Sequence, residues 1–84
     1  MNNMELKDTV ALMESDDYKD RFKAEYYQTK IRYEKLHKMI VKYDAGTLNF
    51  KLKCDISLLR DQQFHMGNYL NFLEIRAEIE GIEL

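Results

Sequence analysis

The sequence of 84 residues contains no proline and no tryptophan, only three glycines and a single cysteine. The absence of proline removes the residue that most strongly interrupts helices. Because Cys54 is alone, there is no intramolecular disulfide, and no paired-cysteine zinc motif, glycine-rich phosphate loop or His-Glu-x-x-His motif occurs. Charged residues interrupt every apolar stretch before it reaches membrane-spanning length, and residues 1–5 lack the basic, apolar start of a secretion signal. We therefore expect a cytoplasmic protein with no membrane segment, metal or cofactor.

Charge is distributed unevenly along the chain, although the formal net charge is only −2. Residues 1–17 carry one basic and five acidic residues, residues 18–53 carry ten and four, and residues 54–84 carry two and six. A negative net charge argues against binding of DNA or RNA polymers, which depends on an excess of positive charge. The basic middle segment indicates either a helix that lies beside acidic neighbours or a local anion site.

The first long segment has the pattern of an amphipathic helix. A helix is predicted over residues 16–45, beginning at a cap formed by Ser15 or Asp16 and ending at Gly46. The spacing of its apolar and semi-polar side chains alternates between four and three residues, which keeps one stripe against a partner helix. The stripe consists of Phe22, Tyr26, Thr29, Tyr33, Leu36, Ile40 and Tyr43.

A second long helix is predicted over residues 55–80, from a cap at Asp55 to a stop at Gly81. Residues 46–54 between the two helices read as a loop. The side chains expected to hold this loop against the helices are Leu48, Phe50 and Leu52.

The second predicted helix carries two adjoining apolar rows, and a single partner helix covers only one of them. The first row is Leu59, Met66, Leu70, Leu73 and Ala77, and the second is Leu58, Tyr69, Phe72 and Ile79. A short helix within residues 1–14 could cover part of the second row, and other subunits would cover the rest, because exposed apolar surface of this extent is uncommon on monomers. We predict an all-α fold in a single domain, residues 1–84. A short N-terminal helix and a long antiparallel helical hairpin are completed by homo-oligomerisation.

Few side chains offer chemistry, and no arrangement of them indicates catalysis. His37, His65 and Cys54 have no partners at ligand or general-base spacing, so structural roles are expected for them. The basic helix combines tyrosines, whose rings can stack on nucleobases, with lysines and arginines that can neutralise phosphates. The candidate ligand-binding residues are Tyr18, Tyr27, Lys30, Arg32 and Arg60.

Two stretches also resemble a known family. They are Tyr18-Lys19-Asp20-Arg21-Phe22 through Leu36-His37-Lys38-Met39-Ile40, and Leu58-Leu59-x-x-Gln62-x-x-x-Met66-x-x-Tyr69-x-x-x-Leu73-x-x-Arg76. This pattern resembles small phage proteins with the hairpin domain shared by anti-CBASS and anti-Thoeris sponges. The resemblance implies a homo-oligomer, with a hexamer favoured, that acts in the cytoplasm of an infected bacterium. It implies sequestration of cyclic nucleotide immune signals, either cyclic di- or trinucleotides or cyclic ADP-ribose isomers, without cleavage.

The resemblance also implies roles for particular residues. Lys30, six residues before Leu36, matches a lysine that holds the ligand in the anti-CBASS sponges, and Tyr18 is the nearest counterpart of a ligand-contacting tyrosine. Arg60 lies near, but not in register with, an arginine that serves a second, cyclic trinucleotide site. The alternative hypothesis is an oligomeric helical assembly or adaptor protein whose apolar rows bind a protein partner by helix-in-groove packing.

Overall fold

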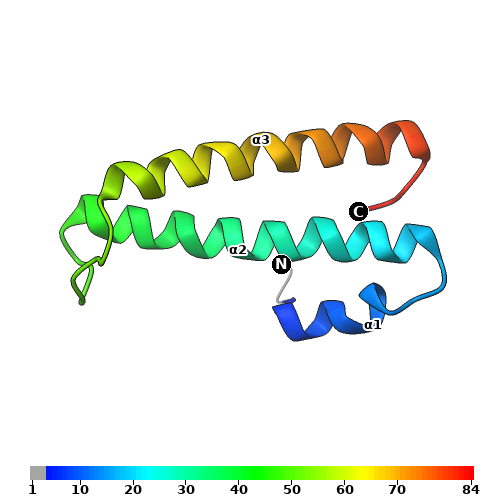
Figure 1. The fold of residues 1–84 in the computed structure, drawn as a ribbon, viewed down its shortest axis with the longest axis horizontal. Helices are drawn as coiled ribbons and strands as arrows, with labels where there is room; N and C mark the ends of the chain where they lie inside the picture. The colour runs from blue at the N-terminus through cyan, green and yellow to red at the C-terminus, as the bar shows by residue number, and fades with distance from the viewer. Residues whose placement is uncertain (1–3) are drawn as a thin grey trace.

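The computed structural model describes residues 4–84, which form helices and no strand. A 3-10 turn η1 (Leu6–Thr9) leads into the short helix α1 (Val10–Met13), followed by the long helices α2 (Tyr18–Ala45) and α3 (Ile56–Glu80). The long helices lie side by side and run in opposite directions, while η1 and α1 lie along another side of α2 (Figure 1). The predicted all-α class is therefore confirmed. No helix within residues 4–84 is long and apolar enough to cross a membrane.

Side-chain caps determine where α2 begins. The cap is Asp17 and not Ser15 or Asp16, and its carboxylate accepts a hydrogen bond from the backbone N–H of Lys19 at 2.9 Å. Ser15 instead donates its hydroxyl hydrogen to the Asp20 carboxylate at 2.8 Å. At the other end, Gly46 stops α2 in the left-handed conformation with φ of 75°, which glycine adopts without a steric penalty.

The N-terminus of α3 is capped by Asp55, as the sequence predicts. The Asp55 carboxylate accepts hydrogen bonds from the Ser57 hydroxyl at 2.7 Å and the Ser57 backbone N–H at 2.8 Å. These two bonds hold the pKa of the Asp55 carboxyl below its ordinary value. The contact therefore favours the ionised carboxylate, and the stability of the start of α3 depends on pH.

We expect acid to weaken this cap. A carboxyl whose pKa is lower in the folded state adds stability above its unfolded pKa, and this stability is lost as pH falls through the folded value. Asp55→Asn keeps a capping oxygen but cannot titrate. Thermal unfolding followed by circular dichroism should therefore show a smaller loss of Tm for Asp55→Asn than for the unaltered chain between pH 5 and pH 2. Equal losses would contradict the assignment.

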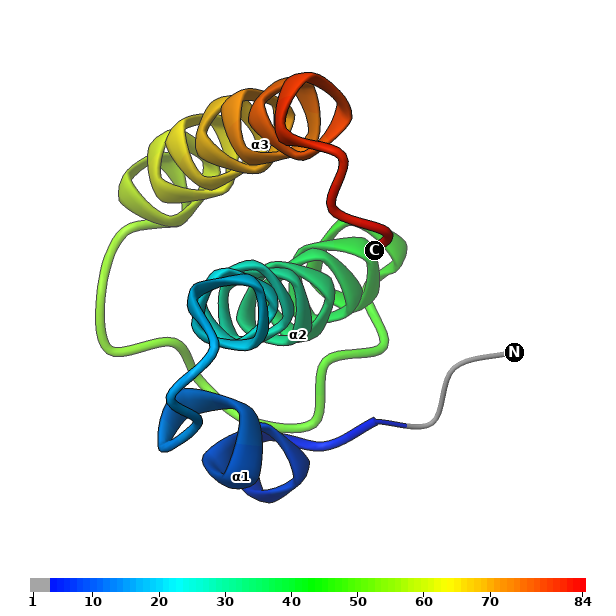
Figure 2. The same cartoon turned by 90° about the vertical axis from the view of Figure 1, so that its right-hand side faces the viewer.

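The N-terminal segment lies against α2 and not against the exposed row of α3. The sequence suggested that this segment could cover part of that row, but Figure 2 shows α2 between α1 and α3. Thr9 is fully buried; its hydroxyl donates to the Leu6 carbonyl at 2.7 Å and accepts from Gln28 Nε2 at 2.9 Å. Residues 1–3 of the predicted 1–14 helix lie outside the described residues. The row on α3 therefore remains open.

The hydrophobic core lies between α2 and α3, mostly near the start of α2. Its buried members are Phe22, Tyr26, Leu70, Leu73, Ala77 and Ile82. Ile82 follows α3, where left-handed Gly81 turns the chain back towards α2. Of the predicted stripe, Tyr43 at the far end is exposed, because it lies beyond the main core. Phe50 does not hold the loop as expected either, since its side chain is also exposed.

The face of α3 that points away from this core carries large apolar side chains. Phe64, Phe72, Ile75 and Ile79 are 65%, 64%, 48% and 79% exposed, and their spacing of eight, three and four residues places them on one side of the helix. We call these four side chains the outer stripe. Leu58 and Tyr69 of the predicted second row are exposed beside it.

Candidate functional site

Lys30 lies at a shallow hollow between the two long helices. The hollow has a volume of about 140 Å³ and is lined by Tyr26, Lys30, Tyr33 and Glu34 of α2 and by Leu70 and Glu74 of α3. The α2 residues are neighbours of Lys30 because positions three and four apart share a helix face. A cationic side chain thus lies between two tyrosines.

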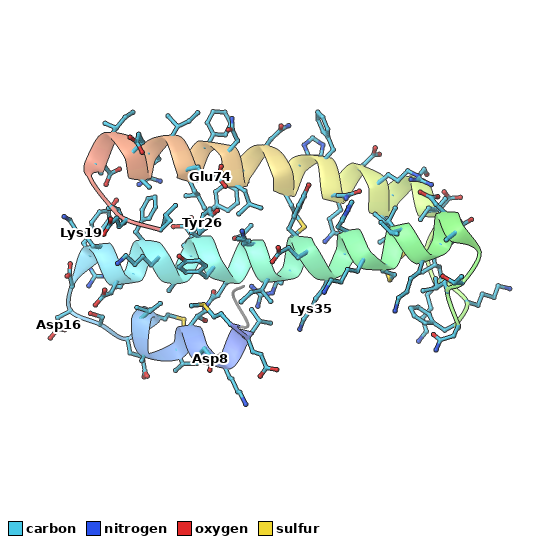
Figure 3. All side chains as sticks on the ribbon, turned by 180° about the vertical axis from the view of Figure 1, so that it is seen from behind. Asp8, Asp16, Lys19, Tyr26, Lys35 and Glu74 are labelled. Carbon is cyan, nitrogen blue, oxygen red and sulfur yellow. The ribbon has the colours of Figure 1, made fainter. Side chains whose placement is uncertain are left out.

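Tyr26 forms one side of the hollow. Its ring is buried, and its hydroxyl donates a hydrogen bond to the Glu74 carboxylate at 2.7 Å. Figure 3 shows Tyr26 and Glu74 meeting between α2 and α3. Burial, and then the bond to Glu74, raise the pKa of the Tyr26 phenol well above its ordinary value. The tyrosine is therefore a neutral hydrogen-bond donor at physiological pH, and the bond holds its ring in place.

Removing this hydroxyl should loosen the two long helices. Tyr26→Phe keeps the buried ring but loses the bond to Glu74, so we expect the free energy of unfolding to fall by about 1 kcal/mol. Urea denaturation at neutral pH measures this change. Glu74→Gln is the matched variant, because its amide can still accept the bond, and it should cost less. A larger loss for Glu74→Gln than for Tyr26→Phe would contradict this role for the hydroxyl.

Tyr33 forms the other side of the hollow. A Cβ added at Gly67 would lie 3.4 Å from Tyr33 Cε1, so the missing side chain at Gly67 leaves room for the ring. The ring also stacks on His37 with a centroid separation of 6.4 Å and an interplanar angle of 5°. His37 Nδ1 is in turn 2.6 Å from Gln63 Nε2. The position of Tyr33 is therefore set by both helices.

Lys30 is the cationic side chain in the lining of the hollow. It is half-buried, and within residues 4–84 its ammonium makes no ion pair within 4.0 Å. Glu34 and Glu74 both line the hollow, but Glu74 already accepts the Tyr26 hydroxyl. An anionic group that entered beside Lys30 would meet a positive charge and the half-buried ring of Tyr33, with the buried Tyr26 ring behind them.

Tyr18 lies elsewhere, where the start of α2 meets the end of α3. Its hydroxyl donates to the Glu80 carboxylate at 2.9 Å and accepts from Arg76 Nη2 at 3.0 Å. The Arg76 guanidinium also lies over the Phe22 ring, 5.0 Å from its centroid. Tyr18 is 12 positions before Lys30, or about 18 Å along the helix. A single protomer therefore does not bring these two predicted residues together.

Arg60 lies at the opposite end of the long helices. Its guanidinium forms an ion pair with the Asp44 carboxylate, with Nη1 and Oδ2 3.1 Å apart. The hydrogen bond from Arg60 lowers the pKa of the Asp44 carboxyl. Lys30 is 14 positions before Asp44, about 21 Å along α2, so Arg60 is also far from the hollow.

The remaining candidates differ in their surroundings. Tyr27 is half-buried, packs against the core and meets the Tyr26 ring edge-on at 5.2 Å. Arg32 is exposed and lies outside the hollow lining. Sequence reasoning assigned Tyr26 and Tyr33 to the core stripe and missed Glu74 at this site. Their helical spacing from Lys30, four before and three after, could have identified the two tyrosines.

The described residues hold no metal centre, since within residues 4–84 no three His, Cys, Asp or Glu side chains gather closely enough to bind an ion. In comparison with known proteins, the Sequestin family model matches residues 16–79, which span both long helices. No curated protein and no solved structure matches the chain.

Proposed function

The chain belongs to the Sequestin family, and from this membership we propose that it is a phage protein that sequesters cyclic nucleotide immune signals. The family name indicates binding and sequestration of a ligand rather than catalysis. The cyclic nucleotide is proposed from the resemblance of residues 18–76 to anti-CBASS and anti-Thoeris sponges. In this mechanism each site removes one signal molecule from solution in the infected bacterial cytoplasm and leaves it chemically intact.

The observation that carries this proposal is the position of the half-buried Lys30 side chain in the hollow, between Tyr26 and Tyr33. A cyclic nucleotide presents phosphates and planar bases within a few ångströms of one another, and the hollow offers a cation beside aromatic rings. A hollow of about 140 Å³ is smaller than the sites that usually enclose a ligand of this size. We infer that a second copy of the chain supplies the rest of the enclosure.

Self-association is proposed to use the outer stripe of α3. Complete burial of its four side chains and of Leu58 and Tyr69 beside them would cover on the order of 600 Å² per protomer, near the roughly 800 Å² of a standard interface. Charge favours an antiparallel contact between two α3 helices. The C-terminal half of α3 is acidic, with Glu74, Glu78 and Glu80 against Arg76, so a parallel contact would place two acidic halves together. An antiparallel contact places this half opposite an N-terminal half in which the charges of Arg60 and Asp61 cancel. A hexamer, favoured by the resemblance, would require further contacts.

Isothermal titration against a panel of cyclic dinucleotides, cyclic trinucleotides and cyclic ADP-ribose isomers tests the function. We expect submicromolar binding of one ligand class, because a sponge must bind more tightly than the effector and each tenfold in Kd is worth about 1.4 kcal/mol. Heating the complex should release the ligand unaltered, whereas an enzyme would release a product. Lack of binding across the panel would reject the sponge.

A helical adaptor is the second candidate, and the outer stripe is the observation that favours it. An amphipathic helix of a host or phage protein could cover the same apolar side chains. Light scattering after size exclusion distinguishes the two occupants. Self-association of the pure chain that Phe72→Glu abolishes would show that another copy covers the stripe, whereas a monomer at all concentrations favours the adaptor.

A further inference from the structure

A second concave surface lies on α2, on a different face from the Lys30 hollow. It is a groove of about 320 Å³ between the later part of α2 and the loop that follows it. We call it the lysine groove. Its lining consists of Lys35, Lys38, Met39, Lys42, Leu48, Asn49 and Phe50. Figure 3 shows Lys35 on the side of α2 where η1 and α1 lie, beyond the start of η1 and opposite α3.

The groove is strongly cationic for its size. Its three lysines are spaced three and four residues apart on one helical face, and its lining contains no carboxylate. Within residues 4–84, none of the three ammonium groups makes an ion pair within 4.0 Å. The Lys30 hollow, by contrast, places one lysine beside two glutamates. The lysine groove is therefore better suited to several negative charges than the Lys30 hollow is.

The remaining lining supplies apolar surface and a hydrogen-bonding group. Phe50 lines the groove and its side chain is 56% exposed. Met39 and Leu48 are half-buried beside it, and Asn49 carries an amide that can both donate and accept hydrogen bonds. A planar ring could therefore stack on Phe50 while its polar edge meets Asn49.

We propose that the lysine groove binds a nucleoside phosphate, with the phosphates on Lys35, Lys38 and Lys42 and the base against Phe50. The groove volume lies within the range of small-molecule sites. A nucleic-acid polymer is a poorer fit, because the chain has a net charge of −2 and only a short patch of uncompensated positive charge. The proposal is independent of the Lys30 hollow, since the two sites share no lining residue.

Titration of the ¹⁵N-labelled unaltered protein with ATP at low salt locates the site. We expect saturable shifts in the backbone amides of residues 35–42 and 48–50. Adenosine alone should bind much more weakly, since it lacks the phosphates. Shifts confined to other segments, or no saturable shift at all, would overturn the proposal without any variant having to fold.

Two variants then test the assigned roles. Lys38→Ala/Lys42→Ala should weaken ATP binding at least tenfold, whereas Lys19→Ala/Lys23→Ala, which removes the same charge elsewhere on α2, should change it less than twofold. Phe50→Ala should weaken ATP binding but leave inorganic tripolyphosphate binding unchanged. Equal losses for the two double variants would show general charge attraction only. If Phe50→Ala left the affinity for ATP unchanged, the proposed contact between the base and Phe50 would be ruled out.

Discussion

The substitution Phe72→Glu, in the outer stripe, should convert the proposed assembly to monomers. The Phe72 side chain is 64% exposed on the protomer, so a charge there costs the isolated fold little. Burial of a phenylalanine is worth about 1.5–3 kcal/mol, and a two-fold contact counts the loss twice. The association constant should therefore fall by roughly a hundredfold or more. Light scattering after size exclusion measures the mass directly.

The matched control is Val41→Glu, which places the same charge on an exposed apolar side chain of α2, outside the outer stripe. It should leave the assembly mass unchanged, and circular dichroism should show the same helicity for both variants. If Phe72→Glu retained the assembly of the unaltered chain, the contact would have to lie on another face. Ile79→Glu, at the most exposed member of the stripe, provides an independent repeat.

The helical class could be predicted from the sequence because its signals are local. Asp55 begins α3 and Gly81 ends it through hydrogen bonds to groups within a few residues along the chain, and Asp17 and Gly46 do the same for α2. Even so, the prediction of Ser15 or Asp16 as the cap of α2 was wrong, because Ser15, Asp16 and Asp17 are three consecutive residues that can each cap a helix. The position of the N-terminal segment could not be predicted, because it depends on Thr9 meeting Gln28, 19 residues away.

The surroundings of the candidate residues were harder to predict, because they depend on pairings between the two helices. Arg60 pairs with Asp44 and Tyr18 with Glu80, and no local spacing specifies either partner. The outer stripe was only half identified, since Phe64 and Ile75 fell outside the predicted rows. The lysine groove required a loop to fold beside α2, where periodic patterns give no guidance.

The decisive change for the proposed function is Lys30→Ala. If the Lys30 ammonium neutralises a ligand phosphate, its loss removes a charge-assisted contact worth about 2 kcal/mol, so Kd should rise roughly thirtyfold or more. The fold should be retained, because Lys30 makes no ion pair within residues 4–84. Titration with the cyclic nucleotide that binds the unaltered protein measures Kd, and light scattering checks that the assembly persists.

Lys23→Ala is the matched control, since Lys23 is also a half-buried lysine of α2 but does not line the hollow. Its Kd should stay within about twofold of the unaltered value. Lys30→Arg retains the charge and should recover part of the affinity. A sponge that binds its ligand through Lys30 requires this order of ligand affinities among the three variants. An adaptor that uses only the outer stripe would bind its partner equally well with any of the three substitutions. Equal affinities of Lys30→Ala and Lys23→Ala for the ligand would show that the ligand does not bind in the hollow, whether or not the protein assembles.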